Sequence, residues 1–136
     1  MKSNLAPLRL AALTDKDLEW LVLALKDNPY GFTPKDALEK VSLGGVQLWR
    51  IEGKATGVLV TSIEVWPAGR ELRVWCMAGK GVFPSQARHL IDNLLTLCSH
   101  YKFRWLAFTN IHPVADKLYK RWMGEPFGTT FVRELK

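Results

Sequence analysis

At Val46 the spacing of the apolar residues changes, and this change restricts the possible folds more than any other feature of the chain. Before it, apolar residues recur every three or four positions, which is typical of amphipathic helices. After it, alternating and β-branched residues are separated by short turns that contain glycine or proline, which is typical of strands. Strands are predicted at residues 46–51, 57–66 and 71–77. Three consecutive strands joined by tight turns indicate an antiparallel sheet.

Two helices are predicted upstream of this sheet, after a short apolar segment at 8–13 that could form a first strand. Thr14 has the character of an N-cap, with Asp17 three residues later in the position of a capping box. Leucines and a valine follow at helical spacing, so the first helix is predicted at 15–26. The second helix opens at Thr33-Pro34, where a proline at the first helical position loses no hydrogen bond, and ends before a pair of glycines.

A long amphipathic helix and an apolar strand follow the meander. The helix is predicted to begin at Ser85, and its apolar stripe consists of Ala87, Leu90, Ile91, Leu94, Leu97, Cys98 and Tyr101. Trp105–Phe108 is apolar at every position, which predicts a strand covered on both faces inside a sheet. Strand, long helix and strand in this order indicate a right-handed crossover between parallel neighbours. A helix at 112–122 and a last strand at 129–135 complete the predicted elements.

The composition of the chain, 48% hydrophobic and 24% charged, is that of an ordinary globular protein, and we expect one domain spanning residues 1–136. Two cysteines are too few for a disulfide scaffold, and the three histidines have no zinc-ligand spacing with them. The formal charge of +6 favours an anionic partner or simply maintains solubility. No apolar run is long enough to span a membrane and no signal-peptide pattern is present, so a cytoplasmic protein is expected.

The predicted order of elements and one motif together resemble the GNAT family of N-acetyltransferases. The motif is Ala115-Asp116-Lys117-Leu118-Tyr119, followed by Gly124, which is similar to the Ala-x-x-Leu-Tyr helix and later glycine common in that family. His112 stands where the family most often has an asparagine, and Asn110 lies just upstream. The resemblance implies an α/β fold with a mixed sheet, in which an antiparallel meander is followed by a parallel crossover to a central strand. Small phage-encoded GNAT-like proteins are similar in length and in the loss of family glycines.

The resemblance implies an enzyme that moves an acetyl group from acetyl-CoA to an amine of a small molecule or a protein. In the family the tyrosine of this helix often protonates the departing thiolate, which makes Tyr119 the candidate acid. The alternative is that Tyr119 simply belongs to the inward face of an amphipathic helix. Glu64 and Glu71 flank the turn after the second meander strand, near where acceptor amines usually approach, and they are the candidate bases. The alternative for these two is a pair of exposed, solvated turn carboxylates.

The segment before the long helix is the candidate binding site for acetyl-CoA, because backbone N–H groups at a helix N-terminus bind phosphate. The candidate contacts are Met77, Gly79, Lys80, Gly81, Ser85, Gln86, Arg88 and Asn110. Ser85 as N-cap, with Gln86 and Arg88 in the first turn, could meet an anion. However, Val82-Phe83-Pro84 occupies the place of the family's glycine-rich loop, and its side chains and missing N–H weaken a phosphate cradle. Gly79-Lys80-Gly81 would then be only a flexible turn.

The remaining candidates have a structural interpretation beside a functional one. Cys76 needs an activating environment to act as a nucleophile, and the alternative is burial in a strand, as for Cys98 in the core. Lys117, Lys120 and Arg121 form one basic patch, which is either a solvated face or a surface for nucleic acid or another acidic partner. The competing prediction is a GNAT-fold protein that has lost its chemistry and binds a partner, such as a phage virion or host-interaction component.

Overall fold

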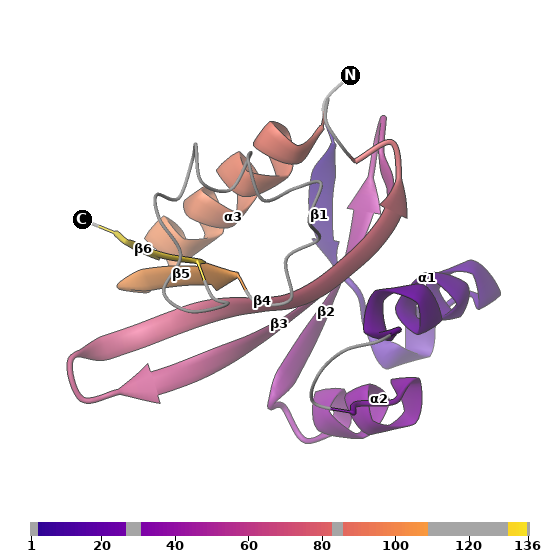
Figure 1. Ribbon diagram of the computed structural model, residues 1–136, viewed down its shortest axis with the longest axis horizontal. Coiled ribbons are helices and arrows are strands. Elements are labelled where there is room, and N and C mark those ends of the chain that lie inside the picture. Colours follow the sequence, from indigo (N-terminus) through magenta and orange to yellow (C-terminus); the bar gives the residue numbers. More distant parts are fainter. Residues whose placement is uncertain (1–2, 27–30, 83–85, 109–130, 136) are drawn as a thin grey trace.

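The computed structural model describes residues 3–26, 31–82, 86–108 and 131–135, which form one six-stranded sheet with helices on both faces (Figure 1). α1 and α2 cover one face, and α3 covers the other. The strands are β1 (Asn4–Pro7), β2 (Val46–Glu52), β3 (Thr56–Trp66), β4 (Gly69–Lys80), β5 (Trp105–Phe108) and β6 (Phe131–Glu134). The helices are α1 (Asp15–Leu25), α2 (Pro34–Ser42) and α3 (Ala87–His100), with a short 3-10 helix, η1 (Leu10–Ala12).

The sheet is mixed, and its strand order follows the chain order from β1 to β6. β1 to β4 pair antiparallel with their neighbours, as do β5 and β6. Among the described strands, the one parallel pairing joins β4 to β5, and α3 connects these two strands. The predicted α/β fold class, the meander and the parallel crossover are therefore confirmed. β5 lies between β4 and β6, in agreement with a strand that is apolar at every position.

Apolar side chains on the two sides of the sheet form separate cores, and we call these sides the α3 face and the α1/α2 face. The main core of the α3 face consists of Leu59, Leu72, Val74, Ile91, Leu94, Cys98, Phe103, Leu106 and Phe108. The core of the α1/α2 face consists of Leu8, Leu21, Leu25, Ala37, Val46, Leu48, Val58, Val60 and Cys76. Both cores therefore combine residues of the predicted helical stripes with residues of the strands.

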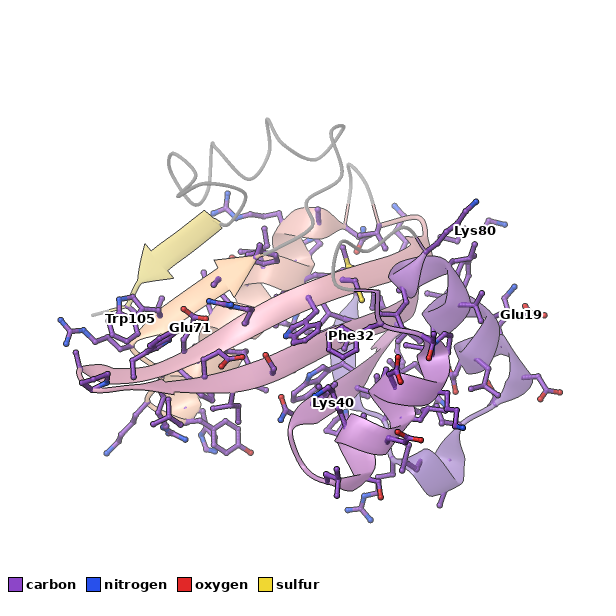
Figure 2. All side chains as sticks on the ribbon, turned by 60° about the horizontal axis from the view of Figure 1, so that its bottom comes forward. Glu19, Phe32, Lys40, Glu71, Lys80 and Trp105 are labelled. Carbon is purple, nitrogen blue, oxygen red and sulfur yellow. The ribbon has the colours of Figure 1, made fainter. Side chains whose placement is uncertain are left out.

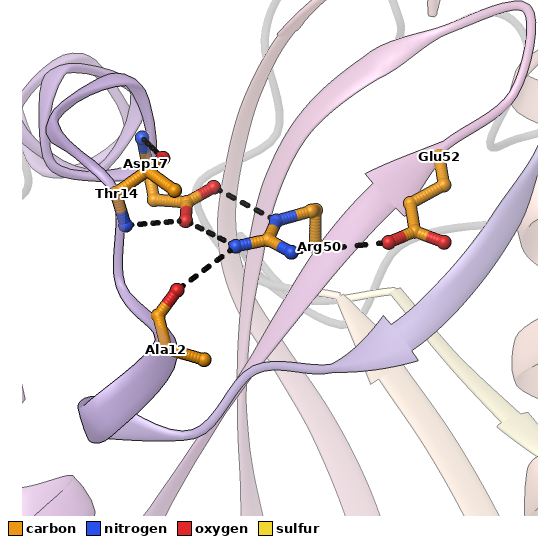
Figure 3. Close-up of polar contacts among 5 residues, drawn as sticks. All are labelled: Ala12, Thr14, Asp17, Arg50 and Glu52. Carbon is orange, nitrogen blue, oxygen red and sulfur yellow. Dashed lines mark hydrogen bonds and ion pairs between the residues drawn. The ribbon is translucent and has the colours of Figure 1, made fainter.

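α1 is held on the sheet by a carboxylate that the sequence indicated only as part of a capping box. Thr14 Oγ1 accepts from the Asp17 N–H (3.1 Å) and Asp17 Oδ2 accepts from the Thr14 N–H (2.9 Å), so this capping box is confirmed. The same carboxylate accepts from Arg50 of β2 through Nε (3.1 Å) and Nη2 (2.5 Å), and Nη2 also donates to the Ala12 carbonyl (3.2 Å; Figure 3). Hydrogen bonding from the Arg50 guanidinium holds the pKa of the buried Asp17 below its ordinary value.

The first strand begins and ends earlier than predicted. It spans Asn4–Pro7 instead of 8–13, because Leu8 turns its side chain into the core while its N–H still donates to the carbonyl of Leu48 (2.9 Å). The chain then leaves the sheet and forms η1, which contains no buried residue. The apolar composition of 8–13 therefore reflects two core contacts, from Leu8 and Leu13, and a partly exposed turn between them, not a strand.

Two further boundaries differ from the prediction. β4 is longer than 71–77 at both ends, because the β3–β4 turn is tight enough to leave Trp66 paired with Gly69. Tyr101 does not belong to the buried stripe of α3, because the helix ends at His100 and the Tyr101 side chain is 54% exposed. In the described part of the chain, no helix combines the length and the apolarity that crossing a membrane requires.

Candidate functional site

β4 and β5 diverge after Val74, and this divergence is the centre of the candidate site. Residues 71–74 of β4 pair with Trp105–Phe108, but β4 continues to Lys80. Beyond Val74, β4 keeps β3 as a neighbour on one side and has no strand partner on the other side among the described residues. An unpaired strand edge presents a row of backbone N–H and C=O groups. An extended ligand could therefore bind along this edge.

The α3 face beneath the divergence is closely packed. A cavity of about 10 Å³ lies there, lined by Leu59, Met77, Ala87, Leu90, Ile91, Leu94 and Phe108. A cavity of this size is at the limit of what accommodates one water molecule, so a long ligand has no preformed tunnel at this point of the described structure. Met77, a predicted cofactor contact, lies half-buried on this lining beside the unpaired part of β4.

Gln86 connects the start of β1 to α3. It is the N-cap of α3, in place of the predicted Ser85, and its side chain is buried with 4% exposed. Gln86 Oε1 accepts from the N–H (3.1 Å) and the hydroxyl (2.9 Å) of Ser3, and the Gln86 N–H donates to the Val82 carbonyl (3.0 Å). Through its amide oxygen, Gln86 therefore fastens the start of β1 to α3.

Gly79-Lys80-Gly81 is not a flexible turn either, since Gly79 and Lys80 are the last residues of β4. Gly79 pairs with Gly57 of β3, and the two backbones approach so closely that a Cβ on Gly79 would lie 2.4 Å from the Thr56 carbonyl oxygen. Only Gly81 has a positive φ (78°), in the turn that follows. The missing side chain of Gly79 therefore serves strand pairing.

Cationic side chains gather at the end of the sheet where α3 begins. Lys80 ends β4, Arg88 lies in the first turn of α3, and Lys54 lies in the β2–β3 turn. This turn reaches the β4–α3 connection, because a Cβ on Gly81 would lie 3.4 Å from the Lys54 carbonyl oxygen. Arg88 Nε lies 3.5 Å from Asp92 Oδ1 in a largely exposed pair. The arrangement places positive charge beside a helix N-terminus, where phosphate groups bind most readily.

The two candidate bases lie directly opposite one another on neighbouring strands. Glu64 of β3 pairs in register with Glu71 of β4, on the α1/α2 face and three residues before β4 diverges from β5. Glu71 is not an exposed turn residue: it is 5% exposed and its Oε2 accepts from Arg73 Nε (2.8 Å). Glu64 is half-buried, and its Oε1 accepts from the Ser62 hydroxyl (3.1 Å).

Aromatic rings lie on the same face as these carboxylates. The Trp75 indole donates from Nε1 to Ser62 Oγ (2.5 Å), and its ring packs against Phe32 with 4.8 Å between centroids. Trp105 of β5 pairs in register with Glu71. Figure 2 shows Phe32, Glu71 and Trp105 on one side of the sheet. The site therefore combines two carboxylates, one guanidinium and aromatic walls next to an unpaired strand edge.

The cysteines are core residues, as their structural interpretation predicted. Both are buried free thiols. Burial raises the pKa of Cys76 and of Cys98 to about 12, so neither is a thiolate at neutral pH. A nucleophilic role for Cys76 is excluded on this ground, because only the thiolate is a good nucleophile.

Several predicted positions lie outside the described residues. These are Ser85, Asn110, His112, Lys117, Tyr119, Lys120 and Arg121. The predicted helix at 112–122 lies outside them as well. These positions keep the status of sequence predictions.

Three residues that sequence analysis did not single out belong to the site. Ser62 and Trp75 form a hydrogen-bond chain with a candidate base, and Lys54 contributes charge near α3. Trp75 had a signal in the sequence, because a large aromatic residue interrupts the alternation of its strand. Lys54 and Ser62 had none, since only the pairing of distant segments brings them to the site.

No protein-family model matches the sequence, and no curated protein matches it either. Solved structures do share its fold. A chain of the NatC complex bound to Gag peptide and CoA matches 100% of both chains with a TM-score of 0.65 at 8% identity. A GNAT family acetyltransferase from Elizabethkingia anophelis with acetyl-CoA bound has a TM-score of 0.61 at 16% identity, over 98% of this chain and 99% of that chain. The PaiA N-acetyltransferase from Thermoplasma acidophilum, in complex with coenzyme A, has a TM-score of 0.62 at 10% identity, over 99% of this chain and 100% of that chain. The fold is therefore that of the GNAT acetyltransferases.

Proposed function

We propose that this protein is an N-acyltransferase that moves an acetyl group from acetyl-CoA to an amine. The observation that carries the proposal is the position of Glu64 and Glu71, which face one another where β4 begins to pair with β5, three residues before the two strands diverge after Val74. This arrangement occurs in a fold shared with structures that hold CoA or acetyl-CoA. A peptide is bound beside CoA in the NatC structure, and a small-molecule or protein amine is the acceptor class proposed for this chain.

The reaction needs one base and one acid. The acceptor nitrogen attacks the thioester carbonyl carbon, so that a C–N bond forms and the C–S bond breaks. One proton leaves the nitrogen and one proton is delivered to the sulfur, which balances the transfer. We assign the first proton to Glu64, reached directly or through one water molecule. Tyr119, which lies outside the described residues, is proposed to supply the second.

Glu64 is a better base than Glu71 because its carboxylate is less buried and is not paired with a cation in the described structure. Glu71 is buried and paired with Arg73, whose guanidinium neutralises its charge. Glu64 accepts one hydrogen bond from Ser62, and its second carboxylate oxygen has no hydrogen-bond partner among the described residues. That second oxygen is the atom that an amine proton could reach.

The described residues fit acetyl-CoA in most respects. The unpaired edge of β4 at 75–80 offers backbone groups to the amides of the pantetheine arm, and the first turn of α3 offers N–H groups to phosphate. Lys54, Lys80 and Arg88 supply positive charge at the same end of the sheet. Gln86 fits less well, because its amide oxygen and backbone N–H are already occupied, which leaves its side-chain NH2 group as the donor for phosphate. From the predicted contacts we retain Met77, Gly79, Lys80, Gly81, Ser85, Arg88 and Asn110.

A GNAT-fold binding protein without catalysis is the second candidate. The observation that favours it is the commitment of Gln86 to Ser3, which removes one group from the expected phosphate site. Such a protein would bind an acidic partner or a nucleic acid through Lys117, Lys120 and Arg121, and a phage virion or host-interaction component is its natural form. Binding to nucleic acid would weaken steeply with salt, by roughly one power of salt concentration per phosphate contact.

Thermal unfolding with acetyl-CoA, followed by an assay of CoA release with a panel of amines, tests the enzyme directly. A ligand at about 100 times its dissociation constant stabilises a protein by roughly 2.7 kcal/mol, which is readily measured. Glu64→Gln should lower kcat while leaving the acetyl-CoA shift unchanged. Glu39→Gln, on the exposed side of α2, is the matched control and should have wild-type kcat. No stabilisation by millimolar acetyl-CoA and no CoA release would favour the binding protein.

A further inference from the structure

We propose that Ser62 and Trp75 are positioning residues that hold the Glu64 carboxylate for proton removal, an inference that rests on the acyl transfer proposed above. The Trp75 indole N–H donates to Ser62 Oγ (2.5 Å), and the Ser62 hydroxyl donates to Glu64 Oε1 (3.1 Å). The three side chains form one hydrogen-bond chain that crosses from β4 to β3. Ser62 is 3% exposed and Trp75 is half-buried, so water competes little for these bonds.

The chemistry of the three side chains determines which group donates and which accepts in each of these hydrogen bonds. An indole nitrogen only donates, and an ionised carboxylate only accepts. A hydroxyl carries a single proton, so Ser62 must accept from Trp75 and give its own proton to Glu64. A partly exposed glutamate otherwise samples several rotamers. The bond from Ser62 selects one of them and occupies Oε1, which leaves the second oxygen of Glu64 for the acceptor amine.

Trp75 can make this bond because β4 carries one extra residue at this point. Val60 pairs with Cys76 and Thr61 pairs with Val74, so Trp75 is the bulged residue between them. β-bulges redirect side chains and are frequent beside active sites. Here the redirected indole is held by the ring of Phe32 at 4.8 Å. The bulge therefore places an anchored N–H donor next to Ser62.

The charges around Glu64 agree with its role as the reactive carboxylate. Like charges directly opposite one another in a sheet destabilise it, and Glu64 faces Glu71. Arg73 offsets this repulsion by pairing with Glu71 (2.8 Å). Lys40 Nζ lies 5.3 Å from the centroid of the Phe32 ring and is the further cation at the edge of this site. One carboxylate is thus neutralised and the other is oriented.

The opposite face of the sheet carries a chain of the same construction, which supplies matched controls. Trp49 Nε1–H donates to Thr61 Oγ1 (2.9 Å), and the Thr61 hydroxyl donates to Gln47 Oε1 (3.0 Å). Thr61 precedes Ser62 on β3, so its side chain is on the α3 face, away from the carboxylates. Trp49→Phe and Trp75→Phe remove the same kind of bond, as Thr61→Val and Ser62→Ala remove the same kind of hydroxyl.

The kinetic test compares these four variants at saturating acetyl-CoA. Trp75→Phe and Ser62→Ala should lower kcat by roughly tenfold or more, a fraction of what a general base contributes, with the KM for acetyl-CoA unchanged. Trp49→Phe and Thr61→Val should lower the melting temperature by a similar amount but keep the wild-type kcat. If both tryptophan variants lose the same share of kcat, the effect is structural and the positioning role is wrong.

An NMR measurement reports on the hydrogen bonds between Trp75, Ser62 and Glu64, and it does not require turnover. In ¹⁵N-labelled protein, the Trp75 indole N–H resonance, assigned by its loss in Trp75→Phe, should move in Ser62→Ala and in Glu64→Gln. The Trp49 indole resonance should stay in place in both. Turnover by the wild-type protein without this shift would refute the positioning role alone. If the shift occurs but no amine is acetylated, the proposed function fails, and the inference fails with it.

Discussion

Asp17→Ala removes the one carboxylate that joins the start of α1 to β2. Asp17 is 4% exposed and accepts three hydrogen bonds, one from the Thr14 N–H and two from the Arg50 guanidinium. The substitution opens the capping box and leaves Arg50 with only the Ala12 carbonyl and a distant Glu52 (3.9 Å). α1 covers the core of the α1/α2 face, so loosening its first turn affects the sheet as well.

The size of the effect can be worked out from these contacts. Loss of the hydrogen bond from the Thr14 N–H to the Asp17 carboxylate costs about 1 kcal/mol, while the Thr14 hydroxyl still caps the helix. Removing one partner of a fully buried ion pair costs about 3–5 kcal/mol, but the Arg50 side chain remains 32% exposed, so we take only about 1–2 kcal/mol for this part. The total is about 2–3 kcal/mol, or a decrease in melting temperature of roughly 10 °C for a domain of this size.

Thermal and urea unfolding of Asp17→Ala and Asp36→Ala together provide the assay. Asp36 is the matched control, because Thr33 and Asp36 form the same capping box at the start of α2 without an arginine partner. We expect a clearly smaller loss for Asp36→Ala than for Asp17→Ala. Equal losses in the two variants would show that the Arg50 pair contributes nothing beyond the cap and would refute the reasoning.

The same prediction has a pH dependence with a definite sign. Because hydrogen bonding from Arg50 lowers the pKa of Asp17 in the folded protein, the stabilisation is fully present above the unfolded pKa of about 3.9. It is lost as the pH falls through the lower folded value. The difference in stability between the wild-type protein and Asp17→Ala should therefore be constant near neutral pH and shrink below about pH 4.

Three further predictions concern the site and its surroundings. A Cβ on Gly57 would lie 2.2 Å from a carbonyl oxygen of β4, so Gly57→Ala should destabilise by about 2 kcal/mol or more in urea unfolding, whereas Gly45→Ala, with nothing closer than 3.9 Å, should cost far less. Gln86→Ala leaves two buried donors of Ser3 unpaired and should lower the free energy of unfolding by about 2–3 kcal/mol without changing acetyl-CoA affinity. Arg88→Ala should weaken acetyl-CoA binding in calorimetric titration and leave the stability unchanged. Burial raises the pKa of Cys76 to about 12, so in native protein at pH 8 this thiol should react with a thiol reagent much more slowly than after unfolding, and equal rates would contradict its burial.

The elements could be predicted from the sequence because their signals are local. The capping box that begins with Thr14 and the proline in the first turn of α2 are confirmed, and so are the meander and the strand at Trp105–Phe108. Each of these depends on residues within a few positions of one another. The contacts of Gln86 with Ser3 and of Arg50 with Asp17 join distant segments, and no local pattern indicates them. The structural contact of Gln86 with Ser3 therefore has no signal in the sequence.

The environments of the two carboxylates of the site also could not be predicted from local sequence patterns. Because Glu64 and Glu71 both flank a turn, the sequence predicts the same for each, either a base near the acceptor amine or an exposed, solvated carboxylate. In the structure their burial differs. Glu71 lies between Glu64 on β3 and Trp105 on β5, and its partner Arg73 covers it further. Two residues with the same side chain, a few positions apart, therefore have different environments, and only the pairing with β5 decides which is buried.

The bulge at Trp75 explains why the site could not be assigned to one side of the sheet from alternation alone. In β4, Leu72 and Val74 face α3, and continued alternation would place residue 76 there as well. The extra residue reverses the phase, so Cys76 packs under α1 and α2 while Met77 turns toward α3. One inserted residue thus directs Met77 to the packed side of the divergence, next to α3. The Trp75 indole stays on the side of the carboxylates, as alternation from Glu71 and Arg73 predicts, and this is the side where the acceptor amine is proposed to bind.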